Sequence, residues 1–400
     1  MDIWGGITGK LFLASLVAMV VFPIQAGART DPASGRVRVL FVGEVMSGNQ
    51  LFLSWISADP QFTLTAVPCD IEYQTMMDAK RFARIYVPRT QDRLNDYDVT
   101  MFEDFTYKVL PLNVLDMFQS SIYEGMGIAL IEFVNWGGDN DISEWMKLSF
   151  YDVFPAEPVM NKFDAGQGRT FYKVVNNNGP LQLPGVESAP LNSGSHGDLI
   201  AKPGSTTEAV WSGRKTPCMV TSTYGKGHTL QLGHGWDNIP YEARLYYAYL
   251  PDFIFHQILC IADLPYPQDL DLVHTVRKLF IDYGNRRTIT LGFLGFVEQW
   301  DINPYKIERR LASVEASRAQ AAGDYLAGDC EHARDILTGL LDEFGAIDQD
   351  LIRAKSRAFL WVYLVEWASV LGTSVVCAYA LWSLMIRRRV YREVKSTRAT

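Results

Sequence analysis

The feature that most constrains this chain is an apolar run near its C-terminus. From Trp367 to Ile386 no charged residue interrupts 20 positions. A helix rising about 1.5 Å per residue would carry this run across the roughly 30 Å hydrocarbon core of a bilayer. The basic segment RRRVYREVKSTRAT follows at once. The run therefore predicts a transmembrane helix over 359–386, with a basic tail at 387–400.

Charge and the N-terminal segment predict which side of the membrane the chain occupies. The tail holds five Arg and one Lys against Glu393, whereas the whole chain has a net charge of −8, so the rest stands at −13. The positive-inside bias places such a tail in the cytoplasm. Residues 1–28 combine Lys10, an apolar run and the small residues Ala26-Gly27-Ala28, which is typical of a secretory signal, with an uncleaved anchor as the alternative. We expect a single-pass type I protein of the cell membrane, largely extracytoplasmic, with no nucleic-acid partner because its body is acidic.

The exported part begins with apolar strands that alternate with helical segments. Short strands separated by helices indicate an α/β fold whose sheet is mostly parallel and covered on both faces. The predicted strands are Arg36–Gly43, 62–69, Asp98–Phe105 and Met126–Phe133, with helices ending near Ala58 and spanning Leu112–Glu124.

The next stretch changes composition and then becomes regular again. Residues 134–215 are rich in Gly, Pro, Asn and Ser, which predicts loops and short irregular strands. CMVTSTY and HTLQLG then flank Gly225-Lys226-Gly227, a pattern typical of a β-hairpin. The apolar segment LPDFIFHQILCIA predicts the last core helix, and Pro265 marks the end of this domain at about residue 265.

Helices are predicted for the rest of the chain. Residues 266–305 form a connecting segment that we expect to be helical, and 306–358 a helical hairpin followed by a juxtamembrane helix. One apolar face supports the hairpin; it consists of Ala333, Ile336, Leu337, Leu340, Leu341 and Phe344. Asp348 and Asp350 are suited to capping a helix start, so we expect a continuous helix to begin there and to run to Ile386.

Five segments, in order along the chain, carry a resemblance to a known superfamily. They are RVLFVG, LNDYDVTMFEDF, YEGMGIALIEFVNWGG, FPAEP and YGKGHTLQLGH. Together they resemble the class I glutamine amidotransferase-like superfamily, particularly its trehalose-utilisation branch, over about Val37–Pro265. The resemblance implies a flavodoxin-like domain with three α/β/α layers at 36–265.

The catalytic pattern of that superfamily is incomplete here. Active members use a Cys at a sharp strand-to-helix turn and a His after a later strand. The turn Val134-Asn135-Trp136-Gly137-Gly138 has no Cys, whereas His234 matches the histidine position. Because an amide needs an activated nucleophile, we expect no amidotransferase activity and assign no catalytic residue, with His234 as the one candidate. A ligand-binding or complex-assembly module is then the expected function.

Polar residues at the strand ends supply a candidate ligand site. Ligands of open α/β sheets bind beyond the carboxyl ends of the strands. The candidates there are Glu44, Glu103, Asp104, Asn135, Trp136, His234 and Asp237. They suit a sugar or polar metabolite with Trp136 as a stacking face, a divalent cation held by Glu44, Asp104 and His234, or no ligand at all if they only cap loops. The alternative function is a metal- or carboxylate-dependent hydrolase acting on an extracytoplasmic glycan or sugar.

Partners and cofactors follow from the same features. Ala368 and Gly372 form a small-x-x-x-small pair, which favours contact with a membrane-protein partner or a second copy through the transmembrane and juxtamembrane helix. The five cysteines show no C-x-x-C spacing, so neither a disulfide frame nor a zinc site is expected. No cofactor is expected apart from the divalent metal considered above.

Overall fold

The computed structural model describes residues 34–46, 48–69, 74–132, 142–164, 168–194, 196–298 and 305–397. The predicted signal segment and the candidates Asn135 and Trp136 lie outside these residues. The chain divides into two compact units after Leu270.

The first unit is built on an eight-stranded sheet with the order β2-β1-β3-β4-β10-β9-β8-β6. Its first five strands are parallel and the last three antiparallel. The parallel strands are β1 (Val37–Gly43), β2 (Phe62–Pro68), β3 (Val99–Glu103), β4 (Gly127–Ile131) and β10 (Gly227–Leu232). The others are β9 (Pro217–Tyr224), β8 (Thr206–Trp211) and β6 (Tyr172–Val174), while β5 (Ala156–Asp164) and β7 (His196–Ala201) form a separate pair.

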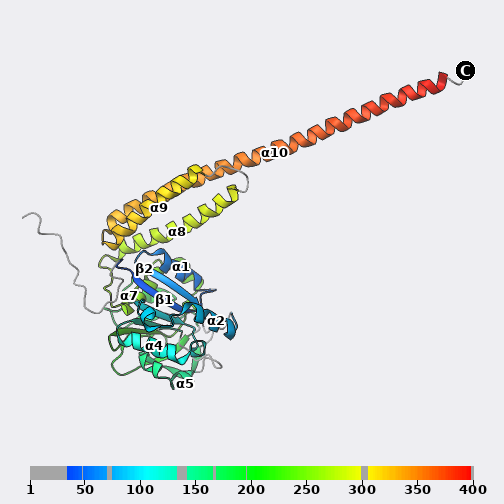
Figure 1. Cartoon of the computed structure of the whole chain (residues 1–400). Coiled ribbons are helices and arrows are strands. Elements are labelled where there is room, and N and C mark those ends of the chain that lie inside the picture. Colours follow the sequence, from blue (N-terminus) through cyan, green and yellow to red (C-terminus); the bar gives the residue numbers. More distant parts are fainter. Residues whose placement is uncertain are drawn as a thin grey trace, which may run out of the picture. The chain divides into compact units, whose positions relative to one another are not determined.

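Helices cover both faces of this sheet (Figure 1). Side chains alternate along β1, so Phe41 stacks on Trp236 on one face, while Leu40 and Val42 join the core of the other. The first face carries α1 (Gln50–Ala58) and α7 (Leu250–Ile261), and the second α2 (Met76–Tyr86), α3 (Gln91–Leu94) and α4 (Leu112–Tyr123). Short elements complete the unit: η1 (Tyr107–Val109), α5 (Ile142–Trp145), η2 (Ser149–Val153), η3 (Val186–Ser188) and α6 (Tyr241–Tyr246).

The predicted mostly parallel sheet is confirmed by its strand pairing, and its central strands are buried on both faces. Every residue of β3 and β4 is buried, which explains why these segments read as continuous apolar runs. The predicted hairpin is β9–β10, where Gly225 has a φ of 62°. A Cβ at Gly225 would lie 2.4 Å from the Tyr123 carbonyl oxygen, so only glycine fits this turn. The irregular stretch before it also contains β6 and β8, which extend the sheet.

The second unit consists of three long helices. They are α8 (Leu270–Glu298), α9 (Tyr305–Leu326) and α10 (Cys330–Thr397). Their core contains ring contacts between Phe280 of α8 and Tyr325 of α9, 5.6 Å apart, and between Tyr283 of α8 and Phe344 of α10, 5.4 Å apart. The predicted hairpin is therefore confirmed as α9 and α10, and α8 adds a third helix to its core.

The predicted start of the last helix is wrong. Asp348 and Asp350 lie inside α10, which begins at Cys330. Their carboxylates pair with neighbouring helices instead of capping a helix: Asp348 with Arg286 of α8 at 3.2 Å, and Asp350 with Arg310 of α9 at 2.7 Å. The predicted continuity from there to Ile386 is confirmed.

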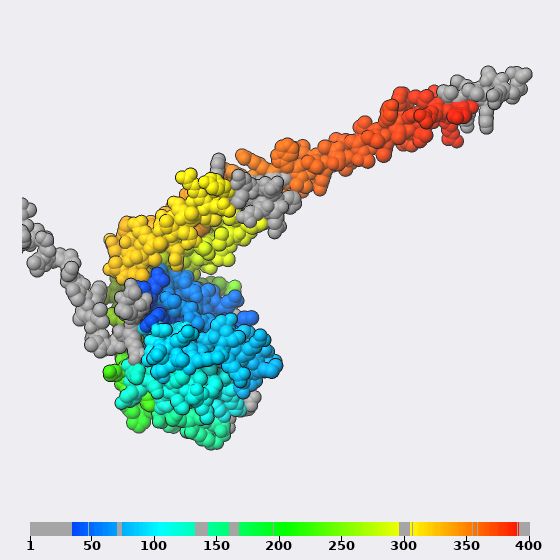
Figure 2. Space-filling view, viewed as in Figure 1, coloured from blue at the N-terminus to red at the C-terminus, as the bar shows by residue number. Residues whose placement is uncertain are grey.

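Beyond its packed section, α10 is one exposed apolar helix. Leu351 is the last residue of α10 in the core of this unit, and the large apolar side chains from Leu360 to Ile386 are mostly exposed. Figure 2 shows this orange and red section of α10 as an isolated rod. By length and composition the helix is suited to crossing a membrane.

Candidate functional site

The parallel sheet changes winding direction at β1. The crossover from β1 to β2 runs through α1 on one face, whereas α4, on the other face, connects β3 to β4. The crevice between the carboxyl ends of β1 and β3 is therefore the topological switch point at which such sheets bind ligands. The two strands approach closely there: Gly43 has a φ of 151°, and a Cβ on it would lie 1.9 Å from the Glu103 carbonyl oxygen.

Five acidic side chains gather at this edge, and we call them the carboxylate cluster. Each follows or ends a parallel strand, and they influence one another's ionisation. The cluster consists of Glu44 after β1, Glu103 and Asp104 at the end of β3, Glu132 after β4 and Asp237 after β10. Four of the five were predicted from the sequence. Glu132 was missed because the predicted strand extended to Phe133, which placed Glu132 inside it.

Glu103 is the most deeply buried member of the cluster. Its side chain has no exposed surface, and its Oε1 accepts the backbone N–H of Trp236 at 2.7 Å. Burial, followed by the negative charge of Asp237, raises the pKa of Glu103 well above its usual range. Its Oε2 has no hydrogen-bond partner within the described residues.

Asn49, at the start of α1, connects the β1 loop to the cluster. Its Nδ2 donates to both the carbonyl oxygen and the carboxylate of Glu44, at 3.2 and 3.1 Å. Its Oδ1 is buried and lacks a hydrogen-bond partner in the described part of the chain. Two buried oxygens, this one and Oε2 of Glu103, thus lack a hydrogen bond within the described residues. The raised pKa of Glu103 favours its protonated form, which can donate as well as accept. Buried polar atoms of this kind are costly unless a ligand or water supplies the missing hydrogen bond.

Glu132 and Asp237 form a carboxyl pair beside Gly235. A Cβ on Gly235 would lie 2.0 Å from Oε2 of Glu132 and 2.2 Å from Oδ1 of Asp237. Asn238 bridges the pair, because its Nδ2 donates to Glu132 at 3.0 Å and to Asp237 at 2.9 Å. Burial raises the pKa of both groups, and the hydrogen bond between them favours a proton on Glu132 and a charge on Asp237. The pair therefore shares one proton.

Two of the four described non-glycine residues with a positive φ lie at the same edge of the sheet. Asp104 has a φ of 41° and Glu132 a φ of 55°, values that residues with a Cβ rarely adopt. They directly follow β3 and β4, two neighbouring strands. Strain of about 1 to 3 kcal/mol per residue persists only where the surroundings enforce it, and such residues cluster at functional sites.

Arg244 of α6 fixes the loop that carries Asp237. It donates to the Asp237 and Ile239 carbonyl oxygens at 2.7 and 2.8 Å, and to the Gly48 carbonyl oxygen at 3.3 Å. Its guanidinium also lies 5.1 Å from the centre of the Phe52 ring. It joins the loops after β1 and β10, and it brings a positive charge to the acidic cluster.

The ring of His234 bonds to groups outside the carboxylate cluster. Its Nδ1 bonds to the Gly235 carbonyl oxygen at 2.7 Å and its Nε2 to the Tyr172 hydroxyl. The first contact requires an N–H, so Nε2 is the acceptor from Tyr172. Burial lowers the pKa of His234 to about 4, and His196 nearby adds to the effect. His234 is thus a neutral residue of the interior whose two nitrogens are both engaged.

The metal hypothesis gains no support from the part of the chain that the structure describes. No group of three His, Cys, Asp or Glu side chains is arranged there to hold an ion. Of its proposed ligands, Glu44 and Asp104 lie at the carboxylate cluster, whereas the ring nitrogens of His234 are occupied by other partners.

The cysteines of the first unit are unsuited to thiolate chemistry. Cys69 ends the β2 segment, Cys218 lies in β9 and Cys260 in α7. Burial raises the pKa of Cys69 and of Cys260 to about 12, and that of Cys218 well above its usual range. A nucleophilic cysteine needs the opposite shift.

No family model matches the chain, and no curated protein matches it. Among solved structures, similarity is found to two cytoplasmic proteins of Salmonella typhimurium. STM1381, from strain LT2, gives a TM-score of 0.46 at 18% identity, and STM3548 gives 0.44 at 15%. Both alignments cover 56% of this chain and 99% of the other protein.

Proposed function

We propose that this chain is a single-pass membrane protein whose extracytoplasmic domain, flavodoxin-like and related to class I glutamine amidotransferases, binds a ligand or assembles a complex without amidotransferase activity. The observation that carries the proposal is the carboxylate cluster at the switch point, combined with the lack of a usable nucleophile. Glu132 takes the strained position directly after β4, and the turn at 134–138, which matches the family's cysteine position, has no cysteine in its sequence.

The membrane assignment is supported by α10 and by the charge distribution. The exposed apolar section of α10 is followed by the basic tail, as expected for a type I orientation after an N-terminal signal. Ala368 and Gly372 offer a surface on which a partner helix or a second copy would pack closely.

The chemistry of the cluster favours a ligand rich in hydroxyl or amino groups. Buried oxygens of Glu103 and Asn49 lack hydrogen bonds within the described residues, and such atoms require a partner. A protonated Glu132 beside a charged Asp237 both donates and accepts. Asp104 and Asp237 are partly exposed and provide the side from which a ligand enters. Trp136, outside the described residues, remains the predicted stacking face.

The binding function is tested by calorimetry on the full-length chain in a neutral detergent. Glucose, trehalose and glucosamine are titrated into the wild-type protein and into Asp237→Asn and Glu103→Gln variants. We expect at least one sugar to bind, and each variant to weaken its binding at least about tenfold, the effect of one hydrogen bond lost at a buried polar group. Asp116→Asn, on the exposed surface of α4, is the control. Binding unchanged in both site variants would contradict the proposal.

The carboxyl pair favours a second candidate, a carboxylate-dependent glycoside hydrolase. A proton held on Glu132 next to a charged Asp237 offers one carboxyl acid and one carboxylate base, the two kinds of group that such a hydrolase needs. This candidate relies on carboxyl groups alone, since His234 is engaged with Tyr172 and Gly235. It predicts that the wild-type chain hydrolyses aryl glycosides and that Glu132→Gln abolishes this turnover. A binding module would show no turnover in the wild type or in the variant.

A further inference from the structure

A basic hollow lies on the first unit beside β2, the edge strand of the sheet. Its volume is about 860 Å³, and its polar walls come from β1, β2 and the segment between α2 and β3. Four arginines line it, Arg38, Arg84, Arg89 and Arg93, and Asp96 is the one carboxylate among the lining residues.

Three of these arginines carry uncompensated charge. Arg84, Arg89 and Arg93 form no ion pair with any carboxylate in the described residues. Arg38 differs, because its guanidinium binds the buried carboxylate of Asp98 through two hydrogen bonds of 3.2 and 3.0 Å. The hollow is therefore net positive on a chain that is otherwise strongly acidic.

The donors around the hollow are partly held in place before any ligand binds. Arg89 donates through Nε and Nη2 to the Arg84 carbonyl oxygen, the first at 2.9 Å. The Tyr97 hydroxyl bonds to Thr65 at 3.2 Å. Guanidinium groups and hydroxyls are the donors that bind the oxygens of phosphate groups, and arginine does so with two parallel hydrogen bonds.

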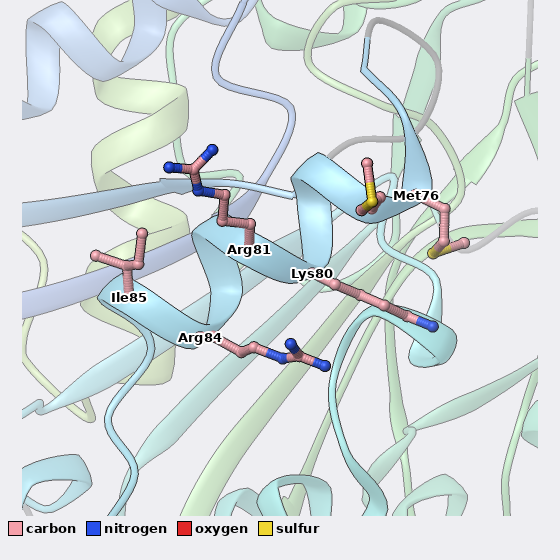
Figure 3. Close-up of a pocket in the computed structure, with 6 residues that line it drawn as sticks. Met76, Lys80, Arg81, Arg84 and Ile85 are labelled. Atoms are coloured by element: carbon pink, nitrogen blue, oxygen red, sulfur yellow. The ribbon is translucent and has the colours of Figure 1, made fainter.

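The helix beside the hollow exposes some of its large apolar side chains. The buried residues of α2 are only Ala79 and Ala83, while 77% of Met77 and 58% of Ile85 is exposed. A second hollow on this helix, about 730 Å³, shares Arg84 and Ile85 with the first. Figure 3 shows Lys80 and Arg84 extending from the same side of α2.

We propose that the hollow beside β2 binds a phosphate group, carried either on a soluble molecule or on a lipid headgroup. Arg84 and Arg93 provide the charge, and Arg89 and the threonine hydroxyls fix the orientation of the oxygens. The site lies away from the carboxylate cluster, because it is lined by the edge strand and α2 rather than by the loops after β1, β3 and β4. It is independent of the ligand bound there.

Calorimetry on the full-length chain in neutral detergent at low salt tests the proposal. The probes are inorganic phosphate, glycerol 3-phosphate and dihexanoyl-phosphatidylglycerol. We expect binding of at least one probe, about tenfold weaker in Arg84→Gln and in Arg93→Gln, and undetectable in the double variant. Binding of the soluble phosphates identifies a soluble ligand, and binding of the lipid alone identifies a headgroup.

Arg81→Gln is the matched control, since Arg81 lies on the same helix but lines only the second hollow. Its affinity for the probes should stay within about twofold of wild type. The replaced side chains are exposed, so each variant should fold as the wild type does. Thermal unfolding of each variant verifies this. No binding in any arm, or equal losses in Arg81→Gln and Arg84→Gln, would overturn the proposal.

Discussion

The replacement of Gly235 by alanine tests the geometry of the carboxylate cluster. The new Cβ would lie 2.0 Å from Oε2 of Glu132 and 2.2 Å from Oδ1 of Asp237, well inside van der Waals contact. Both oxygens end flexible side chains, so they would move apart and lose their shared proton and the Asn238 bridge. Overpacking of this kind costs about 1 to 3 kcal/mol.

Thermal unfolding of the full-length chain measures this loss. In a domain of this size each kcal/mol lowers Tm by about 2 to 4 °C, so Gly235→Ala should lower Tm by about 2 to 12 °C. Gly213→Ala is the matched control, because no described atom lies within 4 Å of its added Cβ. It should leave Tm unchanged or raise it slightly, since alanine reduces the entropy of the unfolded chain.

A mutant cycle that treats the two carboxyl groups as one site assigns the loss to the carboxyl pair. In a chain that carries both Glu132→Ala and Asp237→Ala, the two oxygens are gone. Adding Gly235→Ala to that chain should then lower the free energy of unfolding by less than about 0.5 kcal/mol. If Gly235→Ala behaves like Gly213→Ala in the otherwise unchanged chain, the two carboxyl groups do not meet beside Gly235 and the reasoning fails.

Three further predictions concern pH and the membrane helix. The pKa of Glu103 is raised in the folded state, so its contribution to stability is present below about pH 4.3 and falls as pH rises through the folded pKa; Glu103→Gln should remove this fall in denaturant titrations at several pH values. The pKa of His234 is lowered to about 4, so its contribution is lost as pH falls from about 6.5 to 4, at about 3 kcal/mol. The free energy of unfolding of His234→Gln should therefore depend less on pH in that window than that of the wild type. An unchanged pH dependence would refute this. Gly372→Leu should abolish co-purification of a partner from membranes, and unchanged recovery would leave α10 as a plain anchor.

The sheet could be predicted because its strands are unusual in sequence. β1, β3 and β4 are short, mostly apolar and separated by helices, and a parallel sheet buried on both faces is the structure that favours this pattern. The short strands β6 and β8 gave no such signal, because they lie in a stretch of Gly, Pro and Asn. They are defined by pairing, β8 with β9 and β6 with β8.

The site could be predicted only in part, because its details depend on tertiary contacts. The acids at strand ends were visible, but the proximity of Glu132 to Asp237 depends on Gly235, about a hundred residues away from β4. His234 matched a sequence pattern, whereas its hydrogen bond to Tyr172 places it in the interior. Asp348 looked like a helix cap and instead pairs with Arg286 across the helical unit.

The rate of glutamine hydrolysis tests the central claim most directly. Ammonia release is measured with the purified full-length chain and with His234→Ala, over a range of pH. The account predicts no release above the buffer blank from either protein, because the cysteines of the α/β unit are buried with raised pKa values and His234 has no nucleophile to activate. Turnover by the wild-type chain that disappears in His234→Ala would contradict it.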